Sequence, residues 1–398
     1  MEKPELVIGL FGFGVVGEGL YHVLENSKTV NARIKQICIR NPEKERSLPP
    51  DFFTNEVSKV LEDKEINLFV ELIDDPVEAY NIAKTVLQSG RRIVSGNKKM
   101  LAFHLPELIE LQQKHQGTLL YEASACGSIP IIRNLEEYYD NDLMTSVTGI
   151  LNGSSNFILT KLFKSGTDYA AALKEAQNLG FAESDPSADV DGFDALYKLV
   201  IIATHAIGTW VHPEKLFHTG IRNISRDDIR FAIEKGFKIK LIAKLVKLGK
   251  ENFSLFVMPS LTSPENYVYN VEDEYNGVII EGQYYDKQFM FGKGAGAYPT
   301  GSAVLSDITA CEHAYSYEYK KIKYFRKLSY SEDLKLKIYL RYENLIDLSH
   351  FSFETISEKY TSLQYNFVIG EIWLSELVRL KNIILKLNVF LAFYEEEV

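Results

Sequence analysis

Three glycines near the N-terminus place the strongest constraint on the fold of this 398-residue chain. The apolar run 6–11 is followed at once by Gly12, Gly14 and Gly17 in the spacing G-x-G-x-x-G, and an amphipathic segment continues to about Glu25. This order predicts a strand, a tight turn and a helix. Glycines here let the chain turn, let backbone amides approach a diphosphate, and let the helix pack closely on the strand. The pattern predicts dinucleotide binding, against the alternative of a glycine-rich turn with packing value only.

The second predicted strand, residues 33–39, ends on a cation. A dinucleotide fold selective for NAD needs a carboxylate at this strand tip for the ribose 2′-hydroxyl, whereas this chain has Arg40, followed by Lys44 and Arg46. A guanidinium at this place suits the additional 2′-phosphate of NADP. The alternative is a basic loop that faces solvent. Predicted elements at 66–73, 77–89 and 92–95 continue the strand-helix-strand order of a parallel sheet.

Length and composition narrow the classes of function. The length predicts two or three domains, and 44 basic against 54 acidic residues give a net charge of -10, the wrong sign for a nucleic-acid partner. The three cysteines form no CxxC pair, so neither a disulfide framework nor a cysteine-rich zinc site is expected. The apolar stretch 199–211 is too short to span a bilayer, and the N-terminus lacks the basic region of a signal peptide. We therefore expect a cytoplasmic protein with neither a nucleic-acid nor a membrane partner.

Further segments rich in small or polar residues follow apolar, strand-like runs. They are 95–99, 121–130, 149–156 and 179–186. The ends of strands in an open α/β sheet face the ligand crevice, so these loops are expected to contact substrate. The glycine-rich segment 291–307 indicates a second close approach of backbone to a ligand or to the first domain, or else a hinge.

The densest polar patch runs into an apolar helix that contains a lysine. Its acids are Glu183, Asp185, Asp189, Asp191 and Asp194, and the helix segment 195–202 contains Lys198. A calcium loop is excluded, because its closing position requires a bidentate Glu and this chain has Lys198 there. Asp194 and Lys198 are four residues apart and therefore share one helix face.

Two interpretations of Lys198 stay open at this point. A lysine in an apolar helix either extends its ammonium to solvent or is placed for function. If Lys198 reaches the nicotinamide, it supplies the charge and the proton that a carbonyl accepting hydride requires. Glu183 and Asp194 would then suit a cationic substrate group such as an α-ammonium. The alternative is a surface ion pair beside a solvated acidic loop.

Taken in order, these motifs resemble the homoserine dehydrogenase family. The similarity spans about residues 5–315 and rests on the glycine fingerprint, on Asn97-Lys98-Lys99, and on the segments 122–130, 149–156, 179–186, 189–198 and 292–296. It implies a Rossmann-type dinucleotide-binding domain at 1–130 with a return at 297–315, and an α+β catalytic and dimerisation domain at 131–296. It further implies an NAD(P)-dependent oxidoreductase acting on a CH–OH group, which reversibly reduces L-aspartate 4-semialdehyde to L-homoserine on the route to threonine, isoleucine and methionine.

The resemblance also implies roles for individual residues. Lys198 is implied to be the proton donor and Lys98 a second catalytic lysine, while Glu183, Asp189 and Asp194 bind the amino acid. The cofactor, NADP with NAD as an alternative, is implied to contact Gly12, Phe13, Gly14, Val15, Val16, Gly17, Arg40, Lys98 and Gly296. A monovalent cation, usually sodium in the family, maps to the backbone of Glu122, Ala125, Gly127 and Ile129. A homodimer or a higher homo-oligomer is expected.

One departure from the family pattern concerns the expected cofactor crevice, and two other functions compete with the dehydrogenase. Where the family usually has Glu-Leu-x-Gly-Gly, this chain has Glu71-Leu-Ile-Asp74-Asp75, which places two acids near the cofactor. An acyl-forming aldehyde dehydrogenase would need a thiolate nucleophile, for which Cys126 is the candidate. An NADP-binding amino-acid sensor would bind the cofactor without turnover.

The last eighty or so residues form a separate predicted module. The basic aromatic stretch 315–327 is interpreted as a linker zone, and a strand at 334–341 is followed by a predicted helix, strand, helix and a strand at 388–393. Family members often carry a C-terminal ACT domain of β-α-β-β-α-β order, which residues 328–398 resemble. The usual Asp-x-x-Gly turn is replaced by Asp347-Leu-Ser-His350. We expect a small ACT-like α+β tail that serves dimerisation rather than amino-acid sensing.

Overall fold

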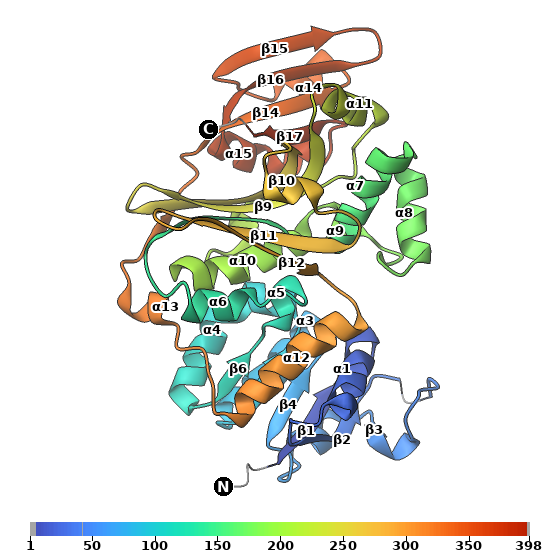
Figure 1. Cartoon of the computed structure of the whole chain (residues 1–398), viewed down its shortest axis with the longest axis vertical. Helices are drawn as coiled ribbons and strands as arrows, with labels where there is room; N and C mark the ends of the chain where they lie inside the picture. Colours follow the sequence, from blue (N-terminus) through green and yellow to red (C-terminus); the bar gives the residue numbers. More distant parts are fainter. Residues whose placement is uncertain (1–4, 42, 396–398) are drawn as a thin grey trace. The chain divides into compact units, whose positions relative to one another are not determined.

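The chain divides into two compact units in a computed structural model that describes residues 5–41 and 43–395 (Figure 1). The first unit comprises Met1–Asp140 and Lys293–Lys320, and the second comprises Asn141–Gly292 and Lys321–Val398. No helix among the described residues is both long enough and apolar enough to cross a membrane.

The first unit is built on a six-stranded parallel sheet. Its strands, in sheet order, are β3 (Phe53–Thr54), β2 (Ala32–Cys38), β1 (Leu6–Phe11), β4 (Leu68–Glu71), β5 (Arg92–Ser95) and β6 (Thr118–Leu120). Its α-helices are α1 (Val15–Asn26), α2 (Val57–Leu61), α3 (Pro76–Gln88), α4 (Lys98–His115), α5 (Ala123–Cys126), α6 (Ile131–Glu137) and α12 (Ala297–Glu312). Every residue of β1 and β4 is buried, as expected for central parallel strands covered on both faces. The order 3-2-1-4-5-6 confirms the predicted Rossmann-type sheet.

The returning helix α12 packs directly on α1, and two glycines permit this contact. A Cβ on Gly19 would overlap the backbone of Ala297, and a Cβ on Gly301 would lie 2.7 Å from the backbone nitrogen of Leu20. The glycine-rich segment before α12 therefore brings the chain back to the first unit at backbone-to-backbone distance.

The second unit is built on an 11-stranded mixed sheet. Nine strands lie in the order β12 (Asp286–Lys293), β11 (Tyr275–Gly282), β7 (Met144–Ile150), β9 (Lys238–Leu248), β10 (Asn252–Thr262), β17 (Phe390–Tyr394), β14 (Lys335–Tyr342), β16 (Asn366–Trp373) and β15 (Thr355–Thr361), while β8 (Phe217–His218) and β13 (Ser329–Tyr330) pair with β10. Its α-helices are α7 (Gly153–Ser165), α8 (Tyr169–Asn178), α9 (Ser187–Val190), α10 (Phe193–Ile207), α11 (Arg226–Glu234), α13 (Lys320–Tyr324), α14 (Leu345–Ser349) and α15 (Leu374–Ile384). Helices α7 and α10 both contact β9, which brings the end of β7 and the start of α10 into one neighbourhood.

From residue 334 onward, the C-terminal segment has one more strand than the sequence pattern predicts, and the short strand β13 precedes it. The predicted order of strand, helix, strand, helix, strand is wrong, because two strands, β15 and β16, follow α14. The complete order is β-α-β-β-α-β, with the antiparallel sheet order β17-β14-β16-β15. Strand β15 escapes prediction because nearly all of its residues are exposed, so it has no alternation of buried and polar positions. Strand β17 also pairs with β10 through Ser260 and Phe393, which makes these four strands continuous with the rest of the sheet in the second unit.

Candidate active site

Each glycine of the fingerprint meets a different steric requirement. Gly12 has a φ of 93°, and a Cβ there would lie 2.6 Å from the carbonyl oxygen of Leu72. A Cβ on Gly17 would lie 2.5 Å from the carbonyl oxygen of Gly12, so only glycine lets α1 begin this close to the turn. Gly14 is different, because the space around its ideal Cβ position is open to 4 Å. The missing side chain of Gly14 leaves the backbone accessible to a ligand.

The N-terminus of α1 suits an anionic group. Gly14 is its N-cap residue and offers no side-chain acceptor to the first-turn amides, and the next residue, Val15, is exposed. Amides at a helix N-terminus bind phosphate oxygens, and the helix dipole adds to the attraction. Phe13 packs edge-on against Tyr21 and Phe53, so its backbone is the part left for a ligand. The turn therefore fits the diphosphate of a dinucleotide.

Arg40 lies where the sequence places it, at the end of β2, and it faces two carboxylates. Its Nη2 atom is 3.9 Å from Asp75 Oδ2 and 3.7 Å from Glu78 Oε2, while its side chain is 81% exposed. Asp75 is the N-cap of α3 and accepts the amides of Val77 and Glu78, which lowers the pKa of its carboxyl. The second acid of the atypical Asp74-Asp75 pair thus caps a helix and faces the guanidinium predicted to meet the 2′-phosphate.

A buried carboxyl at the ends of β4 and β5 organises the segment that precedes Lys98. Glu71 accepts hydrogen bonds from Ser95 Oγ at 2.5 Å and from the amide of Ile73 at 2.8 Å, and burial raises its pKa to about 7. Ser95 Oγ in turn accepts the amide of Asn97, which is the N-cap of α4. Lys98 is the first residue of α4, so this network sets its place at the sheet edge. The sequence does not predict this network around Glu71, although a Glu within the apolar run 66–73 is a usable signal.

The segment predicted to hold a cation is tied together through Glu122. Its carboxylate accepts the amides of Ile132 and Arg133 at the start of α6, and burial raises its pKa to about 7. Its own amide donates to Asp307, which also pairs with Arg133 at 2.8 Å. The carboxylate of Glu122 is therefore engaged by α6, and backbone carbonyls remain as cation ligands. Among the described residues, no group of three or more His, Cys, Asp or Glu side chains is placed to hold a metal.

Lys198 is buried, with its ammonium held by two oxygen acceptors. Its Nζ lies 2.8 Å from Asp194 Oδ2 and 2.7 Å from the carbonyl oxygen of Leu151, and Lys198 and Asp194 are only 7% and 2% exposed. The alternative of a surface ion pair is therefore wrong. Leu151 directly follows β7, and Asp194 is the second residue of α10. The two acceptors come together because β7 and α10 both contact β9.

Asn152 joins the remaining acids to this pair. Its side-chain Nδ2 lies 2.6 Å from Asp189 Oδ1 and 2.9 Å from Asp194 Oδ2. Its Oδ1 accepts the amide of Ser155 and so caps α7. The structure thus brings Asp189, Asp194 and Lys198 together around one amide. In the sequence, Asn152 is one residue of the motif 149–156, and no spacing rule points to these contacts.

The other acids of the patch have different surroundings. Asp185 caps its own turn through Ser187, and Asp191 forms a two-point ion pair with Arg222 at 2.7 Å. Glu183 is exposed, and over residues 5–41 and 43–395 its carboxylate makes no hydrogen bond or ion pair, while its carbonyl accepts from Gln177. Glu183 is thus available to a ligand but is not held by the Asn152 group.

Two further predicted positions bear on cofactor binding and on the competing thiol chemistry. Gly296 is the N-cap of α12 with a φ of 120°, a conformation that favours glycine. Cys126 is completely buried. A nucleophilic thiolate has to be reached by substrate, so this burial disfavours an acyl-forming aldehyde dehydrogenase.

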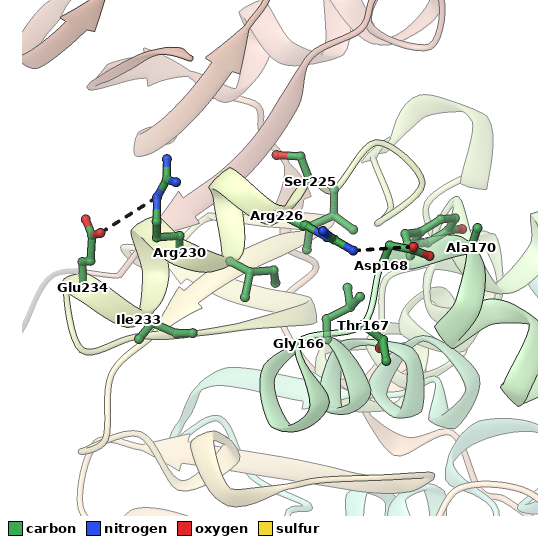
Figure 2. A pocket seen from close by; sticks show the side chains of 13 residues that line it. Gly166, Thr167, Asp168, Ala170, Ser225, Arg226, Arg230, Ile233 and Glu234 are labelled. Atoms are coloured by element: carbon green, nitrogen blue, oxygen red, sulfur yellow. Dashed lines mark ion pairs between the residues drawn. The ribbon is translucent and has the colours of Figure 1, made fainter. Parts of the chain in front are cut away.

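A cavity of about 710 Å³ also lies in the second unit, away from these residues. It opens between the start of α8 and α11, and Figure 2 shows the charged pairs Asp168–Arg226 and Arg230–Glu234 at its rim. Its lining is mostly apolar and includes Leu162, Ile224 and Ile229. Because no predicted site residue lines it, the cavity is not part of the candidate active site.

Two family models match almost all of the residues discussed above. The model described as homoserine dehydrogenase matches residues 130–309, and the model described as homoserine dehydrogenase, NAD binding domain, matches residues 12–122. The chain is 37% identical over 314 residues to a homoserine dehydrogenase of Helicobacter pylori, covering 77% of this chain and 73% of the relative. It is 36% identical over 311 residues to a homoserine dehydrogenase of Synechocystis, covering 76% and 72%.

Solved structures extend the similarity to the C-terminal segment. A homoserine dehydrogenase from Thiobacillus denitrificans superposes with a TM-score of 0.84 at 27% identity, covering 99% of both chains. A hyperthermophilic archaeal homoserine dehydrogenase in complex with NADPH has a TM-score of 0.65 at 25% identity and covers 79% of this chain and 99% of that one.

Proposed function

The chain belongs to the homoserine dehydrogenase family, and on this premise we propose that it reduces L-aspartate 4-semialdehyde to L-homoserine with Lys198 as the proton donor. The supporting observation is the buried Nζ of Lys198, which is bound to two oxygen acceptors. An ammonium carries three N–H bonds, and the described residues take up two of them, at Leu151 and Asp194. The third is left for a substrate oxygen.

Reduction of the aldehyde requires a proton at the aldehyde oxygen. Nicotinamide, when bound, supplies the hydride that the aldehyde carbon accepts, and negative charge then develops on the aldehyde oxygen. Lys198 stabilises that charge and donates a proton to the oxygen, which becomes the hydroxyl of homoserine. Because Lys198 and Asp194 are buried, little water screens the attraction between the ammonium and the aldehyde oxygen. Asp189 and Asp194, with Glu183, bind the α-ammonium of the substrate, and Lys98 at the start of α4 provides a second positive charge.

Turnover distinguishes this function from the sensor alternative. We expect the purified protein to consume NADPH when aspartate semialdehyde is added and to form NADPH from NADP and homoserine, as followed by absorbance. Cys126→Ser should leave both rates unchanged, because the thiol is not part of the mechanism. NADPH binding without any change in its absorbance on adding substrate would instead support the sensor.

We also propose that NADP is used in preference to NAD, with Asp75 limiting the size of that preference. The glycine turn and the open N-terminus of α1 fit the diphosphate, and Arg40 fits a 2′-phosphate. Asp75 and Glu78 already share the Arg40 guanidinium, so a 2′-phosphate has to compete with them and also experiences their charge.

Asp75→Asn should therefore strengthen binding of the 2′-phosphate. Asn is an equally good N-cap, so α3 should be retained while one negative charge is lost. We expect about twofold to fivefold tighter binding of 2′,5′-ADP, which is the scale of an exposed ion pair, and unchanged binding of 5′-AMP, both measured by calorimetry. Asp74→Asn is the control of equal charge. Equal gains in both variants would assign the effect to net charge, and Arg40→Ala should weaken only 2′,5′-ADP.

The proposed monovalent cation is sodium, held by backbone oxygens of Glu122, Ala125, Gly127 and Ile129. Two observations support this choice of ligands. The Glu122 carboxylate is engaged by α6, and Gly127 has a φ of 57°, with the segment around it tied to the Lys293 carbonyl by Ser128. Hard cations of low charge prefer oxygen ligands.

A homodimer is the proposed assembly, and the cytoplasm is the proposed location. Strand β12 lies at the edge of the sheet and is largely exposed. Tyr267, Phe289 and Phe291 form an exposed aromatic cluster at this edge, with neighbouring ring centroids about 6 Å apart. Exposed aromatic clusters on a sheet edge favour association with another chain.

The three buried free cysteines are compatible with a reducing compartment such as the cytoplasm. The β-α-β-β-α-β order supports an ACT-like tail.

A further inference from the structure

Asn152 connects two carboxylates, those of Asp189 and Asp194, beside the ammonium of Lys198. It follows β7 directly, next to Leu151, whose carbonyl holds the Lys198 ammonium. Its amide nitrogen carries two hydrogens, and one carboxylate oxygen lies within hydrogen-bond distance in each of two helices, Asp189 in α9 and Asp194 in α10. Only 5% of Asn152 is exposed, so solvent offers little replacement for these contacts.

The acceptor of Lys198 is itself held by Asn152. The same atom, Asp194 Oδ2, receives the Asn152 amide at 2.9 Å and the Lys198 ammonium at 2.8 Å. Without the amide, Asp194 Oδ2 would lose one of its donors, and the repulsion between the Asp189 and Asp194 carboxylates would be less compensated. The Asp194 carboxylate would then be held less precisely, and so would the Lys198 ammonium that is paired with it.

We propose that Asn152 is a positioning residue of the reaction, which fixes Asp194 and through it the proton-donating ammonium of Lys198. This inference rests on the proposed role of Lys198. The bond from Ser155 to Asn152 Oδ1 is a separate function of the same side chain, namely capping of α7. The two functions use different atoms, so substitutions can separate them.

Asp and Ser preserve the cap but not the double donor. Both rank with Asn as N-cap residues, whereas Asp has no N–H to donate and adds a third carboxylate, and Ser has one hydroxyl. We expect Asn152→Asp and Asn152→Ser to lower kcat about 10-fold to 100-fold, the range caused by small misplacement of a catalytic group. Their thermal midpoints and their affinity for NADPH should stay near those of the unchanged protein. Asn152→Ala should lose rate and also thermal stability.

If Asn152 only caps α7, the expected kcat of the Asp and Ser variants is the opposite. Asp and Ser would then restore kcat, and only Ala would be impaired, which would overturn the proposal. It would equally be overturned if the rate loss in the Asp and Ser variants came with the same fall in thermal midpoint as in Ala. Asn344→Asp is the matched control, because Asn344 caps α14 in the same unit through the amide of Asp347, and it should leave kcat unchanged.

A double-mutant cycle tests the route of action. If Asn152 works through Lys198, adding Asn152→Asp to Lys198→Ala should slow the reaction by less than about threefold, because coupled residues do not add. A full additional loss would show that Asn152 acts independently and would overturn the inference. Normal rates in Lys198→Ala would refute the proposed function itself, whereas a slow Lys198→Ala with normal Asn152→Asp and Asn152→Ser would refute only the inference.

Discussion

Lys198→Ala is expected to lower kcat for aspartate semialdehyde by about 10³-fold. This loss lies in the range measured for removal of a general acid, and it follows from the two contacts that hold the ammonium at Leu151 and Asp194. The affinity for NADPH should stay unchanged, because the glycine turn and α1 bind the cofactor without Lys198. Steady-state kinetics for kcat and fluorescence titration for NADPH affinity measure the two effects separately.

Two further variants test whether the loss of rate comes from lost chemistry or from lost packing. Lys198→Met keeps the length of the aliphatic side chain without the proton, so it should be as slow as the Ala variant if chemistry rather than packing is lost. Lys161→Ala is the control, since Lys161 pairs with Glu175 on the neighbouring helix and lies over the Phe157 ring, and it should retain its rate. A Lys198→Met variant within about tenfold of the unchanged protein would contradict the role of Lys198.

The nucleotide-binding part is predictable from sequence because its requirements are local. Gly12, Gly14 and Gly17 act within one turn of backbone, and the apolar runs on either side follow the periods of strand and helix. The sequence also predicts that Asp194 and Lys198 share a helix face, since four residues complete about one turn. The structure adds that this face is buried, which depends on the packing of α10 against β9 and β10.

The contacts made by Asn152 and Glu71 lie beyond such rules. Asn152 meets acids 37 and 42 residues away, and Glu71 meets a hydroxyl 24 residues away. Contacts of this kind depend on how the helices pack against the sheets. The periodicity of apolar residues in a single sequence does not encode that packing. The tail shows the same limit, because β15 is exposed and polar and becomes a strand through its pairing with β16.

Arg341→Ala is expected to destabilise the second unit by about 3–5 kcal/mol, the range for breaking a buried ion pair. Asp228 is completely buried, and its two oxygens accept from Arg341 Nε at 3.1 and 3.0 Å and from Tyr339 Oη at 2.8 Å. Arg341 belongs to β14 in the tail, while Asp228 belongs to α11. Loss of the Arg341 guanidinium leaves the Asp228 carboxylate without its counter-charge, in a site whose burial already raises the pKa of Asp228.

Urea unfolding measures this loss, and the tail has its own reporter. The chain has two tryptophans, Trp210 and Trp373, and Trp373 ends β16, so a Trp210→Phe background reports on the tail. Arg379→Ala is the control, because the Arg379 side chain, which pairs with Glu376 on α15, is 57% exposed, and its loss should cost less than about 1 kcal/mol. The Arg341→Ala deficit should grow as pH rises above the ordinary Asp range, because the unpaired Asp228 must then either ionise while buried or keep a proton that the unfolded chain has released. A deficit equal to that of Arg379→Ala, or one that shrinks with rising pH, would show that the Arg341–Asp228 pair does not join the tail to α11 energetically.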